Sequence, residues 1–217
     1  MTAADPASSL VARHPTLAPR LGKDDVAAGQ RARLLAAIAH VVGAKGYDAT
    51  TVADVVKEAG VSRTTFYEHF AGKEACFLEA YRHGMEVLDA EVDAAVQGAS
   101  GWREQLRAGI RAYLGVLAAD TATARTYLLE IHHAGEAALA ERTAAMRRFA
   151  ERYRASGRAA GAQEAHPESL FVLCAGTEQL CAETLRVGGD VSALEDVFIT
   201  TAEAILLGPT DPDHEET

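Results

Sequence analysis

Apolar residues recur at helical spacing along most of the chain. Leu34, Ile38 and Val41 follow one another at intervals of four and three residues, which places them on one face of a helix. Phe66 and Phe70 repeat the four-residue interval in a shorter segment. The sequence lacks runs of β-branched residues that alternate with polar ones, which are typical of strands. The pattern therefore predicts an all-α fold of about nine helices.

Capping and helix-breaking residues mark the predicted helix ends. The first helix is expected to begin at Gln30. Thr51, with Asp54 three residues later, forms a capping-box sequence for the second helix, and Ser62 is placed to cap a third, short helix. The remaining helices are expected over about 73–96, 102–119, 121–133, 136–157, 168–187 and 192–207.

Charge is distributed unevenly along the chain. The 217 residues include 21 Lys and Arg and 31 Asp and Glu, so the formal net charge is −10. Residues 20–73 carry eight basic and six acidic side chains, whereas residues 74–217 carry 12 basic and 24 acidic ones. The mildly basic N-terminal quarter is therefore a candidate anion-binding region. The acidic remainder argues against indiscriminate binding of nucleic acids.

The composition argues against membrane, secreted and disulfide-rich proteins. No stretch approaches the roughly 20 apolar residues of a membrane span. Arg13, His14 and Pro15 stand where a signal peptide would need an apolar run. Three cysteines are too few for a disulfide framework. We therefore expect a cytoplasmic protein with no membrane contact and no cofactor.

The segment that follows Thr50 contains two short predicted helices joined by a tight turn at Gly60 and Val61. A short turn that contains glycine lets the second helix cross the first at a steep angle, as in a helix-turn-helix unit. Phe66 and Phe70 give the second helix an apolar side, and its other side is polar. Such a helix fits the major groove of B-DNA, which is about 12 Å wide. The segment therefore predicts DNA binding.

Short motifs in this part of the chain resemble the TetR family of transcriptional regulators. The matching runs are Lys45-Gly46-Tyr47, Ala49-Thr50-Thr51-Val52, Ala59-Gly60-Val61-Ser62, Thr65-Phe66-Tyr67-Glu68-His69-Phe70 and Lys73-Glu74. The resemblance implies a homodimeric regulator, most simply a repressor that a small molecule releases from its operator DNA. Activation instead of repression stays open.

The resemblance also implies how the chain is divided. A flexible N-terminal arm over 1–25 is expected to precede a helix-turn-helix DNA-binding domain over 26–72. A helical effector-binding and dimerisation domain would follow over 73–207, with an acidic tail over 208–217. Within the second domain, the helices over 168–187 and 192–207 are expected to pair with their copies in the dimer.

Roles in DNA binding follow from the resemblance. Arg63 is expected to donate hydrogen bonds to guanine, and Thr64 and Thr65 to reach bases through a hydroxyl or a methyl group. Further residues are expected on phosphates. The full set is Thr51, Ser62, Arg63, Thr64, Thr65, Tyr67, His69 and Lys73. The cations of Arg20, Lys23 and Arg31 are expected to follow the DNA backbone or to reach the adjacent minor groove.

An effector site is expected on the helices that enclose the ligand in the family. The candidate residues are Trp102, Tyr113, Leu117, Tyr127, His132, Phe149, Phe171 and Glu178. Only 6% of the residues are aromatic. The mixture predicts an apolar ligand held by one or two polar anchors.

Other interpretations stay open. Glu130 and His133 form an E-x-x-H pair, but a di-iron bundle needs a second such pair, so no metal site is expected. Cys174 and Cys181 are either buried structural thiols or a redox switch. The sequence lacks an H-E-x-x-H motif and a Gly-rich phosphate loop, so we expect no enzyme. The alternative function is a helical small-molecule-binding or protein-interaction module that does not bind DNA.

Overall fold

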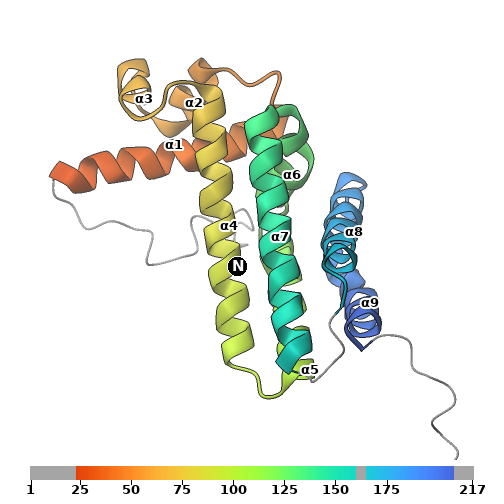
Figure 1. Cartoon of the computed structure of the whole chain (residues 1–217). Coiled ribbons are helices and arrows are strands. Elements are labelled where there is room, and N and C mark those ends of the chain that lie inside the picture. Colours follow the sequence, from red (N-terminus) through yellow and green to blue (C-terminus); the bar gives the residue numbers. More distant parts are fainter. Residues whose placement is uncertain (1–22, 160–164, 208–217) are drawn as a thin grey trace, which may run out of the picture. The chain divides into compact units, whose positions relative to one another are not determined.

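The computed structural model describes residues 23–159 and 165–207. Within these ranges the chain is helical and contains no strand, which confirms the predicted all-α class. The helices are α1 Lys23–Lys45, α2 Val52–Ala59, α3 Arg63–His69, α4 Lys73–Gln97, α5 Trp102–Ala119, α6 Thr121–Leu129, α7 Glu136–Ala159, α8 Pro167–Arg186 and α9 Glu195–Leu207 (Figure 1). Two 3-10 turns, η3 Glu130–His133 and η4 Val191–Leu194, lie before α7 and α9. None of the described helices is long and apolar enough to cross a membrane.

Three helix ends differ from the predicted ones. α1 begins at Lys23, seven residues before Gln30, because no proline interrupts this segment and Ala27 and Ala28 favour a helix. The helix predicted over 121–133 ends at Leu129 and tightens into η3. The helix predicted from 192 begins as η4 and becomes α-helical only at Glu195. The expected arm up to residue 22 and the acidic tail from 208 lie outside the described residues.

The chain folds into two compact units. One comprises the residues up to Leu88 together with Val116–Arg142, and the other comprises Asp89–Gly115 together with the residues from Thr143 onward. The division predicted at residue 73 concerns function rather than packing, and it stays a prediction.

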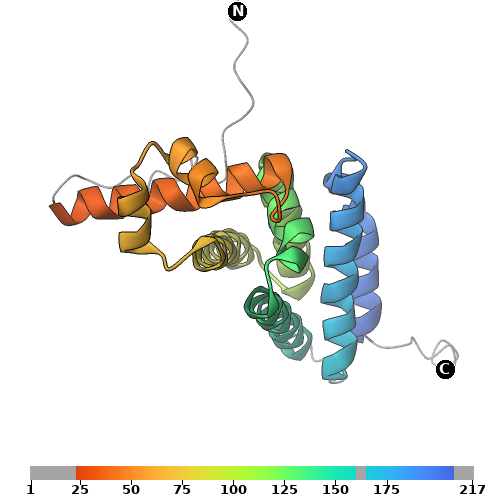
Figure 2. The ribbon, with the colours of Figure 1, turned by 90° about the horizontal axis from the view of Figure 1, so that it is seen from above.

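The core of the first unit joins the three N-terminal helices to α4 and α6. Leu34, Ile38, Phe66, Phe77 and Ile131 are completely buried in it. α1 packs against α2 and α6, and α2 and α3 lie beside α1 in both ribbon views (Figures 1 and 2). Burial of such large apolar side chains is the main contribution to the stability of this unit, at about 1.5–3 kcal/mol for each side chain.

A close approach brings α6 against α1. The Thr126 hydroxyl, which is fully buried, donates to the backbone oxygen of Ala39 across 2.9 Å. Gly43 makes this approach possible, because a Cβ at its position would lie 2.6 Å from Thr126 Oγ1 and 3.1 Å from the Ala122 oxygen.

The second unit has a core of its own. Leu106, Ile110 and Leu114 recur at intervals of four residues along α5 and are buried, as are Leu170 of α8 and Phe198 of α9. α8 and α9 contact each other and lie side by side (Figure 2).

Candidate nucleic-acid interface

The turn between α2 and α3 has the geometry of a helix-turn-helix. Gly60 follows α2 with φ 63° and ψ 38°, in the left-handed region that favours glycine. Its amide and that of Val61 satisfy carbonyls at the end of α2. α3 begins only three residues after Gly60, so the chain reverses quickly from one helix to the next.

α3 buries one side and exposes the other. Phe66 is completely buried and Phe70, at the helix end, is nearly so. Arg63 and Thr64 are exposed, and Tyr67 leaves 49% of its surface accessible. One side of the Tyr67 ring packs against Phe66, with centroids 5.4 Å apart, and the exposed part is available to a partner.

The polar groups at the start of α3 are partly committed to the helix itself. Ser62 caps α3, as predicted, and its hydroxyl accepts from the Thr65 amide across 3.0 Å. The two hydroxyls, Ser62 Oγ and Thr65 Oγ1, also lie 2.9 Å apart. The Arg63 guanidinium stacks 5.7 Å above the Tyr67 ring. The exposed residues of α3 are Arg63, Thr64, Tyr67 and Glu68, so one carboxylate shares this face with the guanidinium and the hydroxyls.

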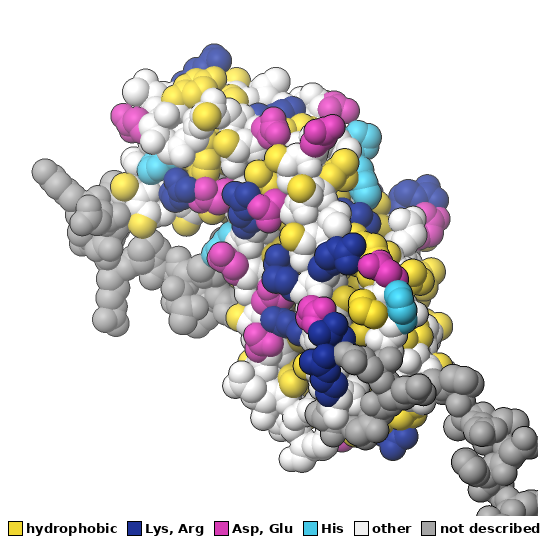
Figure 3. All heavy atoms as spheres, in the orientation of Figure 1, with side chains coloured by type: hydrophobic (Ala, Val, Ile, Leu, Met, Phe, Trp, Pro, Cys, Tyr) yellow, Lys and Arg dark blue, Asp and Glu magenta, His cyan; other side chains and the backbone are white. Residues whose placement is uncertain are grey.

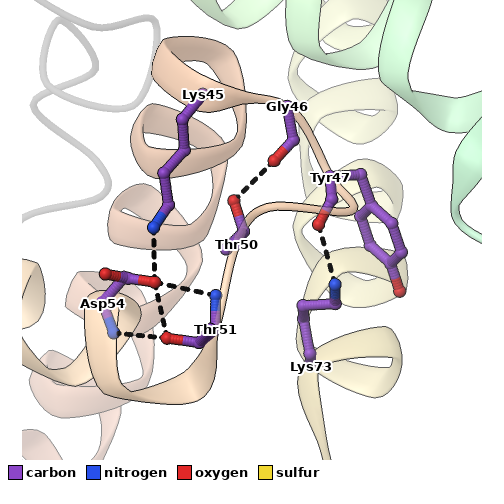
Figure 4. A network of polar contacts seen from close by, with 7 residues as sticks. All are labelled: Lys45, Gly46, Tyr47, Thr50, Thr51, Asp54 and Lys73. Carbon is purple, nitrogen blue, oxygen red and sulfur yellow. Dashed lines mark hydrogen bonds and ion pairs between the residues drawn. The ribbon is translucent and has the colours of Figure 1, made fainter.

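Thr51 forms the predicted capping box at the start of α2 (Figure 4). Its hydroxyl donates to Asp54 Oδ2 at 2.5 Å, and the Thr51 amide donates to the same oxygen at 2.9 Å. Lys45 Nζ completes the network 2.5 Å from Asp54 Oδ2. These hydrogen bonds, first of all the one from Lys45, hold the pKa of Asp54 well below its usual range. The network fixes the end of α1 against the start of α2.

Lys73, expected on a phosphate, has an intramolecular partner here. Its Nζ donates to the Tyr47 backbone oxygen across 2.7 Å and lies 4.0 Å above the Tyr47 ring (Figure 4). The Tyr47 hydroxyl has a raised pKa because the side chain is buried and lies near Glu74 and Asp48. The first residue of α4 is thus tied to the link between α1 and α2.

His69 ends α3 and is only partly exposed. Its Nε2 is buried and has no hydrogen-bond partner within the described ranges. Any contact from this side chain to a phosphate would therefore have to use Nδ1.

Arg31, expected on the DNA backbone or in the adjacent minor groove, has an intramolecular partner. Its Nε donates to Glu79 Oε1 at 2.6 Å, and its Nη2 pairs with Glu79 Oε2. No signal in the sequence identifies this pair, because 48 residues separate its members. Arg20 lies outside the described residues, and the structure does not describe the side chain of Lys23.

Charged side chains of both signs share the visible surface. On the face drawn in Figure 3, Lys and Arg alternate with Asp and Glu rather than forming a continuous basic field. Arg82 pairs with Glu141, for example, and Arg152 pairs with Asp89 and Asp93. This face therefore offers DNA no continuous field of positive charge.

The candidate effector residues fall in both compact units. Leu117, Tyr127 and His132 belong to the first. Tyr127 is buried, donates from its hydroxyl to the Ala80 oxygen across 2.8 Å, and has a raised pKa because of this burial. His132 is exposed on η3, and partial burial of its ring, with Arg142 and His133 nearby, lowers its pKa.

The other five candidates belong to the second unit. Tyr113 packs against Phe149 with ring centroids 6.2 Å apart, and a hydrogen bond joins Tyr113 to Cys181. Trp102 and Phe171 carry stacked guanidinium groups, from Arg103 at 4.7 Å and Arg147 at 4.8 Å. Glu178 lies close enough to raise the pKa of the Cys174 and Cys181 thiols further, after burial, to about 12.

The E-x-x-H pair takes part in contacts of another kind. The Glu130 carboxylate accepts from the Tyr47 amide, and His133 Nδ1 lies 3.6 Å from Asp48 Oδ2. The described ranges contain no group of three or more His, Cys, Asp or Glu side chains that could hold a metal ion.

Comparison with known proteins agrees with this geometry. Residues 34–80 match the family model described as bacterial regulatory proteins, tetR family. The chain is 28% identical over 102 residues to the HTH-type transcriptional activator FasR of Mycolicibacterium smegmatis, and 30% identical over 90 residues to the HTH-type transcriptional regulator BetI of Brucella suis. These alignments cover 47% and 42% of this chain, and they span only 45% and 44% of the two relatives.

Solved structures extend the likeness in fold to most of the chain. The fatty acid degradation regulator FadR from Bacillus halodurans superposes with a TM-score of 0.72 at 18% identity, covering 88% of this chain and 98% of that one. FadR from Bacillus subtilis, solved in complex with stearoyl-CoA, gives a TM-score of 0.70 at 18% identity over 82% and 98% of the two chains. Residues 34–80 therefore match the tetR family model, and most of the chain shares the fold of these solved regulators.

Proposed function

We propose that this chain is a DNA-binding transcriptional regulator that responds to a small molecule, most simply a repressor that the molecule releases from its operator. The observation that carries the proposal is the outward face of α3, where Arg63, Thr64 and Tyr67 are exposed while Phe66 and Phe70 are buried. This face lies within the segment that matches the tetR family model. FasR and BetI are named as transcriptional regulators, which supports a regulatory and not an enzymatic role.

α3 is suited to the major groove through its exposed N-terminal residues. Arg63 supplies a planar guanidinium that can donate two hydrogen bonds to O6 and N7 of guanine. Thr64 offers a hydroxyl and a methyl group beside it. Tyr67 lies one turn further on and presents a hydroxyl to the phosphate backbone. The Ser62 cap and the Thr51 network serve this interface indirectly, by fixing the helix starts.

A homodimer through α8 and α9 is part of the proposal. Exposed apolar side chains lie on or directly after these two helices: Val172, Leu180, Val187, Val197 and Leu207. Val172 and Leu180 fall within one face of α8 at helical spacing, and Val187 follows directly after the end of the helix. Gly176 on the same face has open space in place of a side chain, which allows close approach of another helix. An apolar face of this kind is typical of an interface between subunits.

We place the effector site in the second unit, around Tyr113, Phe149 and Glu178. The support is a group of half-buried polar side chains within one helical unit: Tyr113, Tyr153 and Glu178. Tyr113 has a strongly raised pKa because it is buried, and so has Tyr153. Neutral hydroxyls and thiols next to aromatic rings suit a largely apolar ligand with a polar end. The effector candidates Tyr127 and His132 have less support, since Tyr127 already donates to a backbone oxygen.

Fluorescence anisotropy with DNA that spans the region upstream of the coding sequence tests the proposal. Wild type is compared with Arg63→Ala, Thr64→Ala and Tyr67→Ala at low and physiological salt, with Arg82→Ala as a control because Arg82 is paired with Glu141. We expect Arg63→Ala to lose about 1–3 kcal/mol of discrimination against scrambled DNA. Tyr67→Ala should weaken both DNAs alike, and Arg82→Ala should match wild type.

The contrary outcomes are also defined. If wild type binds neither upstream DNA nor any sequence selected from a random pool, the chain is instead a helical ligand-binding or interaction module. If binding occurs, a reporter gene behind the selected site decides the sign of regulation. Rising expression on deletion of the regulator means repression, and falling expression means activation, as in the name of FasR.

A further inference from the structure

Arg31 joins three helices through a single side chain. It projects from α1, and its Nε and Nη2 form a two-pronged pair with the carboxylate of Glu79 on α4. Its Nη1 points at the backbone oxygen of His69, 3.5 Å away at the end of α3. The guanidinium carbon also lies 4.8 Å above the ring of Phe70. One guanidinium on α1 therefore contacts both the end of α3 and the side of α4.

α3 needs such an anchor because it is short. It has seven residues, too few to be stable as an isolated helix. Phe70 leaves the helix in an extended conformation, with φ −138° and ψ 137°, so the last turn ends abruptly beside Arg31. Ser62 fixes the first turn, and Arg31 is the charged group at the last one. Carbonyls at a helix C-terminus favour a cation at this position.

The donors of Arg31 are largely committed within the protein. A two-pronged pair with a carboxylate holds the guanidinium plane in a fixed direction. Arg31 and Glu79 keep 40% and 31% of their side-chain surface, so the pair is only partly screened by water. The negative charge of Glu79 also opposes the positive charge that Arg31 would present to DNA.

We propose that Arg31 and Glu79 are a positioning pair that sets the orientation of α3 against α4, and that Arg31 does not bind a DNA phosphate. The inference rests on the proposed DNA-binding function. DNA affinity and sequence discrimination would then depend on this contact on the inner side of α3, as well as on the exposed side chains of α3.

Substitution of Glu79 distinguishes a positioning role of Arg31 from a phosphate contact, because the two roles predict opposite changes in DNA affinity. If Arg31 is a positioning residue, Glu79→Gln weakens its hold on α3, and affinity for the specific DNA falls by about tenfold. If Arg31 binds a phosphate, the same variant frees the guanidinium and removes a negative charge, so affinity rises. Arg31→Lys keeps the charge but not the two-pronged geometry, so it should behave like Glu79→Gln.

The salt dependence of binding gives a second readout. Each phosphate contact contributes about 0.9 to the slope of log K against log salt concentration. We expect Arg31→Ala to lower affinity for specific DNA and leave this slope unchanged. A slope reduced by about 0.9, or tighter binding by Glu79→Gln, would overturn the proposal and make Arg31 a phosphate contact.

Hydrogen exchange tests the positioning role without DNA. Arg31→Ala and Glu79→Gln should speed exchange of the amides in α3 and leave those of α8 and α9 unchanged. Arg82→Ala is the matched control, because it removes another arginine–glutamate pair of the same unit, the one with Glu141. Equal exchange of α3 in wild type and both variants would overturn the proposal. If wild type binds no DNA, the proposed function fails, and the exchange result alone decides whether this pair positions α3.

Discussion

Glu130 Oε2 accepts a hydrogen bond from the backbone amide of Tyr47 across 2.8 Å, although 83 residues separate the two. Glu130 begins the 3-10 turn η3 that follows α6, and Tyr47 lies in the link between α1 and α2. Lys73 contacts the same link, because its Nζ donates to the Tyr47 backbone oxygen. The link therefore has both of its Tyr47 backbone groups bound to side chains of distant segments, which fixes where α2 begins.

Removal of the Glu130 carboxylate should loosen this link. Glu130→Ala leaves the Tyr47 amide without its acceptor, and we expect a loss of about 1–3 kcal/mol in the free energy of unfolding. Urea unfolding gives this number, and hydrogen exchange at Tyr47 reports the contact itself. Glu130→Gln keeps an oxygen that can accept the bond, so it should lose less than Glu130→Ala. Full protection of the Tyr47 amide in Glu130→Ala would contradict the geometry.

Gly43 should not tolerate a side chain. A Cβ there would lie 2.6 Å from Thr126 Oγ1, which is buried and already bonded to Ala39. Overpacking of this kind costs about 1–3 kcal/mol and outweighs the gain of up to about 1 kcal/mol that alanine gives over glycine in a helix. We expect Gly43→Ala to lower the denaturation midpoint in urea.

Gly115→Ala is the matched control for Gly43→Ala. Gly115 lies within α5, and a methyl group added there would meet no atom within 4 Å, so the same change should stabilise the protein slightly. In a Thr126→Ala background the penalty at Gly43 should shrink, because Oγ1 is gone. If Gly43→Ala is as stable as Gly115→Ala, α6 does not approach α1 as closely as described.

Local sequence signals predict the parts of the fold that local interactions determine. The caps at Thr51 and Ser62 and the buried faces of Phe66 and Phe70 depend on residues within four positions of one another, so spacing is enough. The predicted start of α1 is too late, because the apolar stripe begins after the helix does. Periodicity also does not distinguish η3 from a further turn of α6, since an apolar residue such as Ile131 fits the apolar pattern of either one.

Long-range pairs are beyond the reach of these signals. In the sequence, Arg31 looks like any arginine that could bind a phosphate near α3. Nothing in the sequence indicates that it pairs with Glu79. The spacing of Glu130 to His133 suits a metal ligand, but the actual partner of Glu130 is a backbone amide. Spacing defines which residues share a helix face, but tertiary packing decides what that face meets.

The proposed dimer makes a prediction about α8. Val172 and Val187 leave 66% and 68% of their surface exposed, and burial of each against a second copy would remove it from water. Val172→Glu should therefore shift the protein from dimer to monomer in light scattering coupled to size exclusion. Leu139→Glu, on α7 and 37% exposed, is the control and should leave the mass unchanged. A wild-type monomer, or a Val172→Glu dimer as stable as wild type, would remove α8 from the interface.

We expect the three cysteines to be unreactive toward thiol reagents while the protein is folded. Cys76, Cys174 and Cys181 are free and buried, and burial raises the pKa of each thiol to about 12. At pH 8 the native thiols are therefore protonated, and a thiol reagent should label none of them until the protein unfolds. Rapid labelling of native Cys174 or Cys181 would favour the redox switch over buried structural thiols.

The same pKa shifts fix the direction of the pH dependence of stability. An unfolded cysteine ionises near pH 8.5, as is ordinary for the thiol, whereas the folded one stays protonated up to about pH 12. The contribution of each thiol to stability is thus complete below about pH 8.5 and is lost as pH rises toward 12. Between about pH 9 and 10, the free energy of unfolding should fall by up to about 1.4 kcal/mol per pH unit for each buried cysteine. Urea unfolding of wild type and Cys76→Ala at about pH 7, 9 and 10 measures this slope, which should be smaller in the variant because one ionising group is gone.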